Sequence, residues 1–193
     1  MPGARTHDVI TVLSGAAIAP LVQSFQTYNG IAPEIAWRNT AILVGAHLLS
    51  GIMFSPDLDL DSAIDNRWGP FYWIWRPYMH LVPHRHFWSH SLVISPLLRL
   101  GYFYLMLVLI LVGGGWLLAQ VGVIVPAYHR QLTDWILGLV RSYPQQTRAF
   151  LAGFITGSAA HTIADYLVTD GKRFLAYFGI RLRRSYRNHD RYR

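Results

Sequence analysis

The residues of this chain with types and spacings suited to chemistry are histidines and aspartates set in a weakly charged, apolar sequence. Ionisable groups in apolar surroundings are unstable unless they are paired or bind a metal ion. Sets of such residues at metal-ligand spacing therefore predict one shared cation site. They occur at four places: His7-Asp8, His47 followed by Asp57-Leu58-Asp59, His84-Arg85-His86 with His90, and His161 with Asp165.

His161 and Asp165 lie four positions apart, which places both side chains on one face of a helix. Such a pair can hold one or two cations, or it can simply stabilise the helix. The small residues Gly157-Ser158-Ala159-Ala160 precede it and permit close packing of another helix. Because the pair is embedded in apolar sequence, metal ligation is the favoured interpretation.

The densest cluster is His84-Arg85-His86 with His90, where three histidines within seven residues are hard to explain by packing. A helix that begins near Phe87 would place His86 and His90 on one face and His84 on the preceding turn. This pattern predicts metal or phosphate chemistry. Arg85 could hold a substrate anion through two parallel hydrogen bonds.

Asp57 and Asp59 follow an apolar helix and, in an extended segment, present their carboxylates on one side, which suits the bridging of metal ions. Asp61 is interpreted as a solvent-facing cap. A calcium loop of the EF-hand type is excluded, because Ser62 and Trp68 stand where that loop needs glycine and a carboxylate.

His47 and His7 are less certain ligands by position. A single histidine on an apolar helix is more often a hydrogen-bonded core residue, but the nearby acidic loop makes ligation by His47 an equal alternative. His7 is a candidate ligand in the first turn of a predicted helix. Asp8, in the same turn, also fits a partner of the helix dipole.

The composition predicts a membrane protein. Apolar residues make up 52% of the chain and charged residues only 14%, with 7 Trp and 11 Tyr of the kind that gather at a lipid–water boundary. There is no cysteine, which excludes disulfides, thiolate ligands and cysteine nucleophiles. With no serine-nucleophile motif either, metal-activated water is the only strong nucleophile that the sequence offers.

The net charge of +7 lies entirely in the C-terminal tail, where Lys172–Arg193 holds eight basic residues and one acid. A basic tail after apolar helices favours the cytoplasmic face of a plasma, inner or thylakoid-type membrane and contact with anionic lipid. Nucleic acid is the less favoured partner, because the tail has no recognition motif.

The predicted fold is all-α, with one helical domain over residues 1–171 and a basic tail over 172–193. Trp68–Pro83, rich in aromatics and prolines, is predicted to be irregular, and Gly113-Gly114-Gly115 to interrupt the third helical region. Asp170-Gly171 is predicted to end the last helix. The expected helices cover about Thr6–Val22, Pro33–Phe54, a region from Phe87 through Leu100–Val125, Leu132–Val140 and Thr147–Val168.

A shared site also constrains the topology. If His90 and His161 meet, the chain between them must leave and return to the same level of the membrane. The apolar stretch after Arg99 is therefore predicted to be one arm of a protruding helical hairpin, whose return arm begins at the triple glycine or later.

Four motifs together resemble a family of metal-binding membrane proteins of unknown function, best known from cyanobacteria. More distantly, they are similar to the YdjM-like membrane-bound, metal-dependent hydrolases, whose pattern pairs an Asp-x-Asp loop with a His-Arg-x-x-Thr-His-Ser turn. The resemblance runs from Arg5 to about Gly171. The motifs are Arg5–Thr11, Ser55–Asp59, Pro83–Ser91, and Gly157–His161 with Asp165.

The resemblance implies a helical hydrolase related to zinc phospholipase C and P1-type nucleases, in which His and Asp cluster metals that activate water. The spacing from His84 to His90 is one residue longer than in the YdjM-like pattern, and Ser89 replaces Thr, so His84 and His86 both remain candidates. The ligands that the resemblance favours are His47, Asp57, Asp59, His84, His90, His161 and Asp165.

The expected function is a hydrolase with two or more divalent ions, zinc or manganese, acting on a phosphoester with Arg85 and Asp59 in catalysis. The alternative is a non-enzymatic component of a membrane complex in which the metal stabilises the helices. In that case Trp68–Tyr78 and the basic tail would contact partner proteins.

Overall fold

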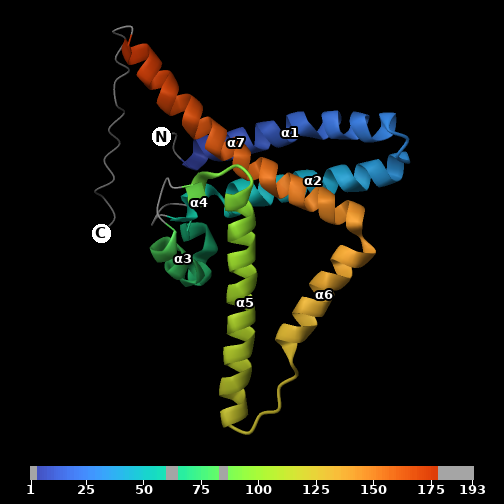
Figure 1. The fold of residues 1–193 in the computed structure, drawn as a ribbon, viewed down its shortest axis with the longest axis vertical. Coiled ribbons are helices and arrows are strands. Elements are labelled where there is room, and N and C mark those ends of the chain that lie inside the picture. Colours follow the sequence, from blue (N-terminus) through green and yellow to red (C-terminus); the bar gives the residue numbers. More distant parts are fainter. Residues whose placement is uncertain (1–3, 60–64, 83–86, 178–193) are drawn as a thin grey trace.

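The part of the chain that the computed structural model describes, residues 4–59, 65–82 and 87–177, is helical and contains no strand (Figure 1). The prediction of an all-α fold is confirmed for these residues. The elements are α1 (Ala4–Tyr28), α2 (Pro33–Met53), the 3₁₀ helices η1 (Pro56–Asp59) and η2 (Asp65–Trp75), α3 (Arg76–Leu81), α4 (Phe87–His90), α5 (Ile94–Gln120), α6 (Tyr128–Ser142) and α7 (Pro144–Tyr177).

The centre of the fold is the packing of α7 against α2, with α1 on their flank. Two glycines of α7 let the helix backbones touch: a Cβ atom on Gly153 would overlap the carbonyl oxygen of Leu43, and one on Gly157 that of His47. Small residues spaced four apart are a common means of such close approach. The close packing predicted around Gly157 is therefore confirmed.

Helices α5 and α6 form a hairpin that protrudes from this centre (Figure 1). The hydroxyls of Tyr104 and Thr133 lie 2.8 Å apart and join the two arms. The predicted interruption at Gly113 is wrong, because α5 continues to Gln120 and the chain turns only at Gly122, where φ is +80°. A glycine inside a helix costs roughly 1 kcal/mol, which a long apolar helix tolerates.

An aromatic core holds the base of the hairpin against η2, α3 and α7. Phe54 lies at its centre and makes edge contacts with rings from η2, α5 and α7. The segment predicted to be irregular thus folds into η2 and α3, short helices that supply this core. Its buried members are Ala46, Phe54, Leu58, Trp75, Tyr78, Val82 and Phe154.

Two helices are longer than predicted. Helix α1 continues beyond Pro20 to Tyr28, and α7 passes through Asp170-Gly171 to Tyr177. Proline and glycine weaken a helix locally, but the neighbouring helix stabilises the continuation of α1 along α2. Since α7 crosses position 171, the proposed boundary between domain and tail falls inside a helix.

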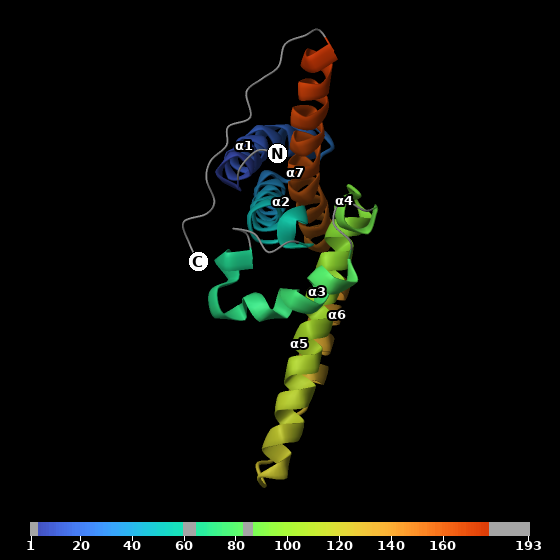
Figure 2. The same cartoon turned by 90° about the vertical axis from the view of Figure 1, so that its left-hand side faces the viewer.

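Three helices are long and apolar enough to cross a membrane by length and composition: Arg5–Tyr28, Pro33–Asp59 and Ile94–Gln120. They do not run in one direction. Helices α1 and α2 lie across the direction of α5 in Figure 1, and in Figure 2 they are viewed nearly along their axes while α5 still descends. In the most apolar 18-residue stretch of each helix, called its apolar window, half of the residues of α2 are buried inside the protein. In α5 none of the residues of this window is buried.

Candidate metal centre

Five side chains from four elements meet where α1 begins, beside η1 and α4 and against the middle of α7. They form two groups in which the ligand atoms lie within 4.8 Å of one another. His7, Asp57 and His161 form the first group, and Asp57, His90 and Asp165 the second. Asp57 belongs to both. The structure thus brings together ligands from all four places that the sequence singled out, although not His47.

The contacts inside the cluster are short and mostly shielded from solvent. His7 Nε2 lies 3.3 Å from Asp165 Oδ1, and His161 Nε2 lies 3.5 Å from Asp57 Oδ2 and 3.7 Å from Asp165 Oδ2. The rings of His7 and His161 stack with centroids 3.7 Å apart. Both histidines are buried, with exposed fractions of 1% and 0%.

The two stacked rings have few protein partners. Within the described residues, Nδ1 of His7 and Nδ1 of His161 make no hydrogen bond, although both atoms are buried. Buried polar atoms in folded proteins nearly always have a partner. Imidazole nitrogens gathered beside two carboxylates are the ligands that zinc and manganese take in proteins, so this donor set fits a divalent transition metal.

The local structure explains why these side chains point the same way. In α7 the four-residue spacing places His161 and Asp165 on one face, as predicted. The hydroxyl of Ser89 lies 2.9 Å from Nδ1 of His90, a contact that orients the ring. At the other side, Arg67 forms two hydrogen bonds with Asp8, which fixes η2 to the first turn of α1.

The charges within the cluster stabilise one another. Burial acts to raise the pKa of Asp165, but the contact with His7 and the charge of His161 outweigh it. The pKa of this carboxyl therefore lies below its ordinary value. Asp165 is ionised at neutral pH, as a metal ligand must be.

His47 is placed away from both groups. Its Nδ1 lies 3.0 Å from the Thr156 hydroxyl, and its Nε2 lies 3.0 Å from the Ser14 hydroxyl and 3.1 Å from the Thr11 carbonyl oxygen. The side chain joins α1, α2 and α7 by hydrogen bonds. Of the two alternatives for His47, these contacts favour the core residue.

Asp59 joins neither group of described ligands, although it is only 4% exposed. The predicted extended segment is instead the 3₁₀ helix η1, and residues two apart in such a helix point in different directions. The carboxylates of Asp57 and Asp59 therefore do not share a side. The charge of Asp59 acts on Arg99 and on Tyr78.

Arg99 is a buried cation that sequence reasoning missed. It is 0% exposed, and its Nη2 donates a hydrogen bond of 2.6 Å to the Ser158 hydroxyl of α7. Burial also raises the pKa of the nearby Tyr78 hydroxyl to about 12. In the sequence, Arg99 is simply the last charge before an apolar run, a position typical of a membrane flank, so no local signal marks it as buried.

Four predicted residues lie outside the described residues: His84, Arg85 and His86 of the dense cluster, and Asp61 of the acidic loop. The roles predicted for them stay predictions.

Over the residues that the structure describes, fold and site define a helical protein with two overlapping His–carboxylate groups that could hold a metal. The chain belongs to the family described as uncharacterized metal-binding protein (DUF2227), whose model matches residues 2–175. The family predicted from the motifs, metal-binding and of unknown function, is confirmed to that extent. No curated protein and no solved structure matches the chain significantly.

Proposed function

We propose that the protein is a membrane-bound, metal-dependent hydrolase that cleaves a phosphoester. The observation that carries this proposal is that two groups of ligand-type side chains share Asp57. A carboxylate has two oxygens and can bridge two ions, the arrangement by which two-metal enzymes hold both the attacking and the leaving oxygen of a phosphoester. The motifs similar to those of the YdjM-like hydrolases support the same reaction class.

Bound divalent ions, zinc or manganese, would polarise the phosphoryl group and lower the pKa of a water molecule. Residues of this chain would position the ions. Asp57 belongs to both groups, and the contact of Ser89 with Nδ1 of His90 would orient that ring for an ion at Nε2. Arg85 is proposed to bind phosphate oxygens. Asp59 is proposed to position η1 through its charge interaction with Arg99.

The proposed membrane association rests on α5. No residue in its apolar window is buried by the rest of the protein, and Leu105 and Leu109 are about half exposed. We infer that the α5–α6 hairpin inserts into lipid while α1 and α2, which run across it, lie along the membrane surface (Figure 2). The metal cluster at the base of the hairpin would then face the interface, with the basic tail on the cytoplasmic side.

The test is hydrolysis by the purified protein after metal removal and reloading with zinc or manganese, measured as release of the phenol from an aryl phosphodiester and an aryl phosphomonoester and of inorganic phosphate from a long-chain alkyl phosphate. Asp57→Asn, which keeps the side-chain volume, is expected to reduce cleavage to background. His129→Ala, in the hairpin and outside both groups, is the matched control and should retain wild-type activity.

A wild-type protein with confirmed bound metal that cleaves none of these three substrates would contradict the hydrolase. The ion would then be structural, joining α1, η1, α4 and α7, and its removal would lower the melting temperature without any loss of catalysis.

A further inference from the structure

A cavity of about 570 Å³, open to the surface, lies where α4 leads into α5, opposite α7. Its volume is in the range of ligand sites, about 300–1,000 Å³. The walls are mostly apolar. They include Phe87, Leu92, Val93, Ile94, His90 and Tyr166.

One wall of this cavity belongs to the metal cluster. His90 lines the cavity and is also a member of the group that contains Asp57 and Asp165. Across the cavity, Tyr166 directly follows Asp165 in α7. A molecule in the cavity therefore contacts His90, one member of the second group of ligands.

The other side of the cavity is continuous with the apolar surface of α5. Leu92, Val93 and Ile94 are between 42% and 49% exposed, and Ile94 begins the helix whose apolar window is entirely unburied. Below it Leu97 and Leu105 are also exposed, at 40% and 51%. An apolar path thus runs from the proposed lipid-facing helix to the metal cluster.

We propose that this cavity binds the hydrocarbon chain of an amphiphilic phosphate, whose head group lies at the Asp57–His90–Asp165 group. The substrate class of the enzyme is then a lipid phosphate rather than a water-soluble phosphoester. The part of this inference that concerns turnover rests on the proposed function; the part that concerns binding does not.

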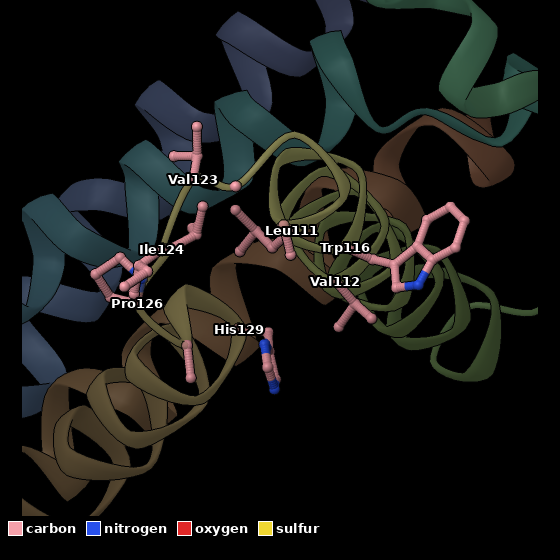
Figure 3. A pocket seen from close by; sticks show the side chains of 12 residues that line it. Leu111, Val112, Trp116, Val123, Ile124, Pro126 and His129 are labelled. Carbon is pink, nitrogen blue, oxygen red and sulfur yellow. The ribbon is translucent and has the colours of Figure 1, made fainter.

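A second cavity in the hairpin provides the comparison. It has a volume of about 510 Å³ and lies between the end of α5 and the start of α6 (Figure 3). Its lining is also apolar, with Leu111 and Ile124 among its side chains, and His129 is its one ionisable residue. No member of either metal group lines it, so chain binding there would be ordinary lipid contact.

The experiment uses a non-hydrolysable alkylphosphonate that carries a photoreactive diazirine in its chain, and an alkyl alcohol with the same diazirine. Both are crosslinked to the full-length zinc-loaded protein in phosphatidylcholine nanodiscs, and labelled residues are mapped by mass spectrometry. The phosphonate is expected to label residues 87–94 and Tyr166. Removing zinc should reduce this labelling about tenfold, equivalent to about 1.4 kcal/mol of lost binding.

Variants separate the cavity from the lipid-facing surface. Leu92→Gln should reduce phosphonate labelling at Tyr166, while Leu111→Gln in the hairpin cavity should leave it unchanged. Metal removal from the wild type keeps the test decisive if Leu92→Gln fails to fold. Labelling that is the same for phosphonate and alcohol, independent of zinc and spread along α5, would overturn the proposal.

The two proposals fail in different ways. If the cavity shows zinc-dependent labelling but the protein cleaves no phosphoester, the proposed hydrolysis is contradicted and the proposed binding site is supported. If the protein cleaves aryl phosphates but shows no zinc-dependent labelling, the hydrolase is supported and the lipid-phosphate binding site is contradicted.

Discussion

At the scale of single residues, Asp57 differs from the other ligand-type side chains because both groups include it. If each group holds one ion, substituting the shared residue Asp57 should remove more metal than substituting His7 or His90, which each belong to one group. Asp57→Asn should lose both ions of a pair, whereas His7→Ala and His90→Ala should each retain about one, as expected for a bridged two-metal centre. Elemental analysis of the purified variants, with His129→Ala as control, measures this. Equal loss in all three would indicate a single ion.

Arg99 leads to a second prediction, about stability. Arg99 is fully buried, and the charges of Asp59 and Asp57 act on it; removing one charge from such a buried set typically costs about 3–5 kcal/mol. Arg99→Met should lower the free energy of unfolding by an amount in that range. Chemical denaturation in detergent measures the change. The double variant Arg99→Met/Asp59→Asn should recover part of the lost stability. If it recovers none, Arg99 and Asp59 do not interact energetically.

Sequence spacing singled out those candidate ligands of the two groups whose neighbours along the chain already mark them. His161 and Asp165 share a helix face, and Asp57 and His90 lie in dense polar motifs. Spacing could not decide whether His47 is a metal ligand or a core residue, because the hydrogen-bond partners of His47 come from other helices. It placed Asp59 wrongly beside Asp57, because two short polar residues between leucines suit an extended strand as well as a 3₁₀ turn.

At the scale of elements, the contact of α2 with α7 depends on glycine. A Cβ on Gly157 would meet the rigid backbone of His47, so Gly157→Ala forces the helices apart and should destabilise the protein by about 1–3 kcal/mol. Gly114→Ala is the matched control, because that glycine is exposed on α5 with nothing near its Cβ position. The control should be neutral or stabilising by up to about 1 kcal/mol. Thermal unfolding of both variants distinguishes them; equal melting temperatures would contradict the packing argument.

The existence of the long helices followed from apolar runs and helix-starting prolines, and α2 was predicted to within a residue of its end. The errors concern where helices stop. The first helix was expected to end at Val22, the third to be interrupted at Gly113 and the last to end at Gly171, yet each position lies inside a helix. Local propensities of about 1–3 kcal/mol were outweighed by packing against α2 in the case of α1 and by an unbroken apolar sequence in the case of α5.

At the scale of the whole molecule, the crossed arrangement of α1 and α2 with α5 means that all three cannot stand upright in one bilayer (Figures 1 and 2). Composition alone could not show this, because each helix is long and apolar enough to cross. The helices differ in burial, since the protein covers half of the most apolar stretch of α2, 11% of that of α1 and none of that of α5. In the proposed function α5 is the inserted helix because the protein leaves its apolar stretch uncovered.

A spin label tests that orientation, and the absence of cysteine makes each introduced thiol unique. A label at Leu109→Cys in α5 should collide with lipid-soluble oxygen and be shielded from a water-soluble nickel chelate. A label at Glu34→Cys, an exposed charged position at the start of α2, should show the opposite preference. Equal access of the nickel chelate to both positions would exclude insertion of the hairpin.

Both ligand groups need a residue of α1 or η1 together with a residue of α7. During synthesis the ribosome therefore releases His7 and Asp57 long before His161 and Asp165 exist, and a nascent chain without α7 has an incomplete ligand set in either group. Bringing such distant positions together also carries an entropic cost that the folded helices must offset. An ion that requires either complete group can therefore be held only after the last helix has docked.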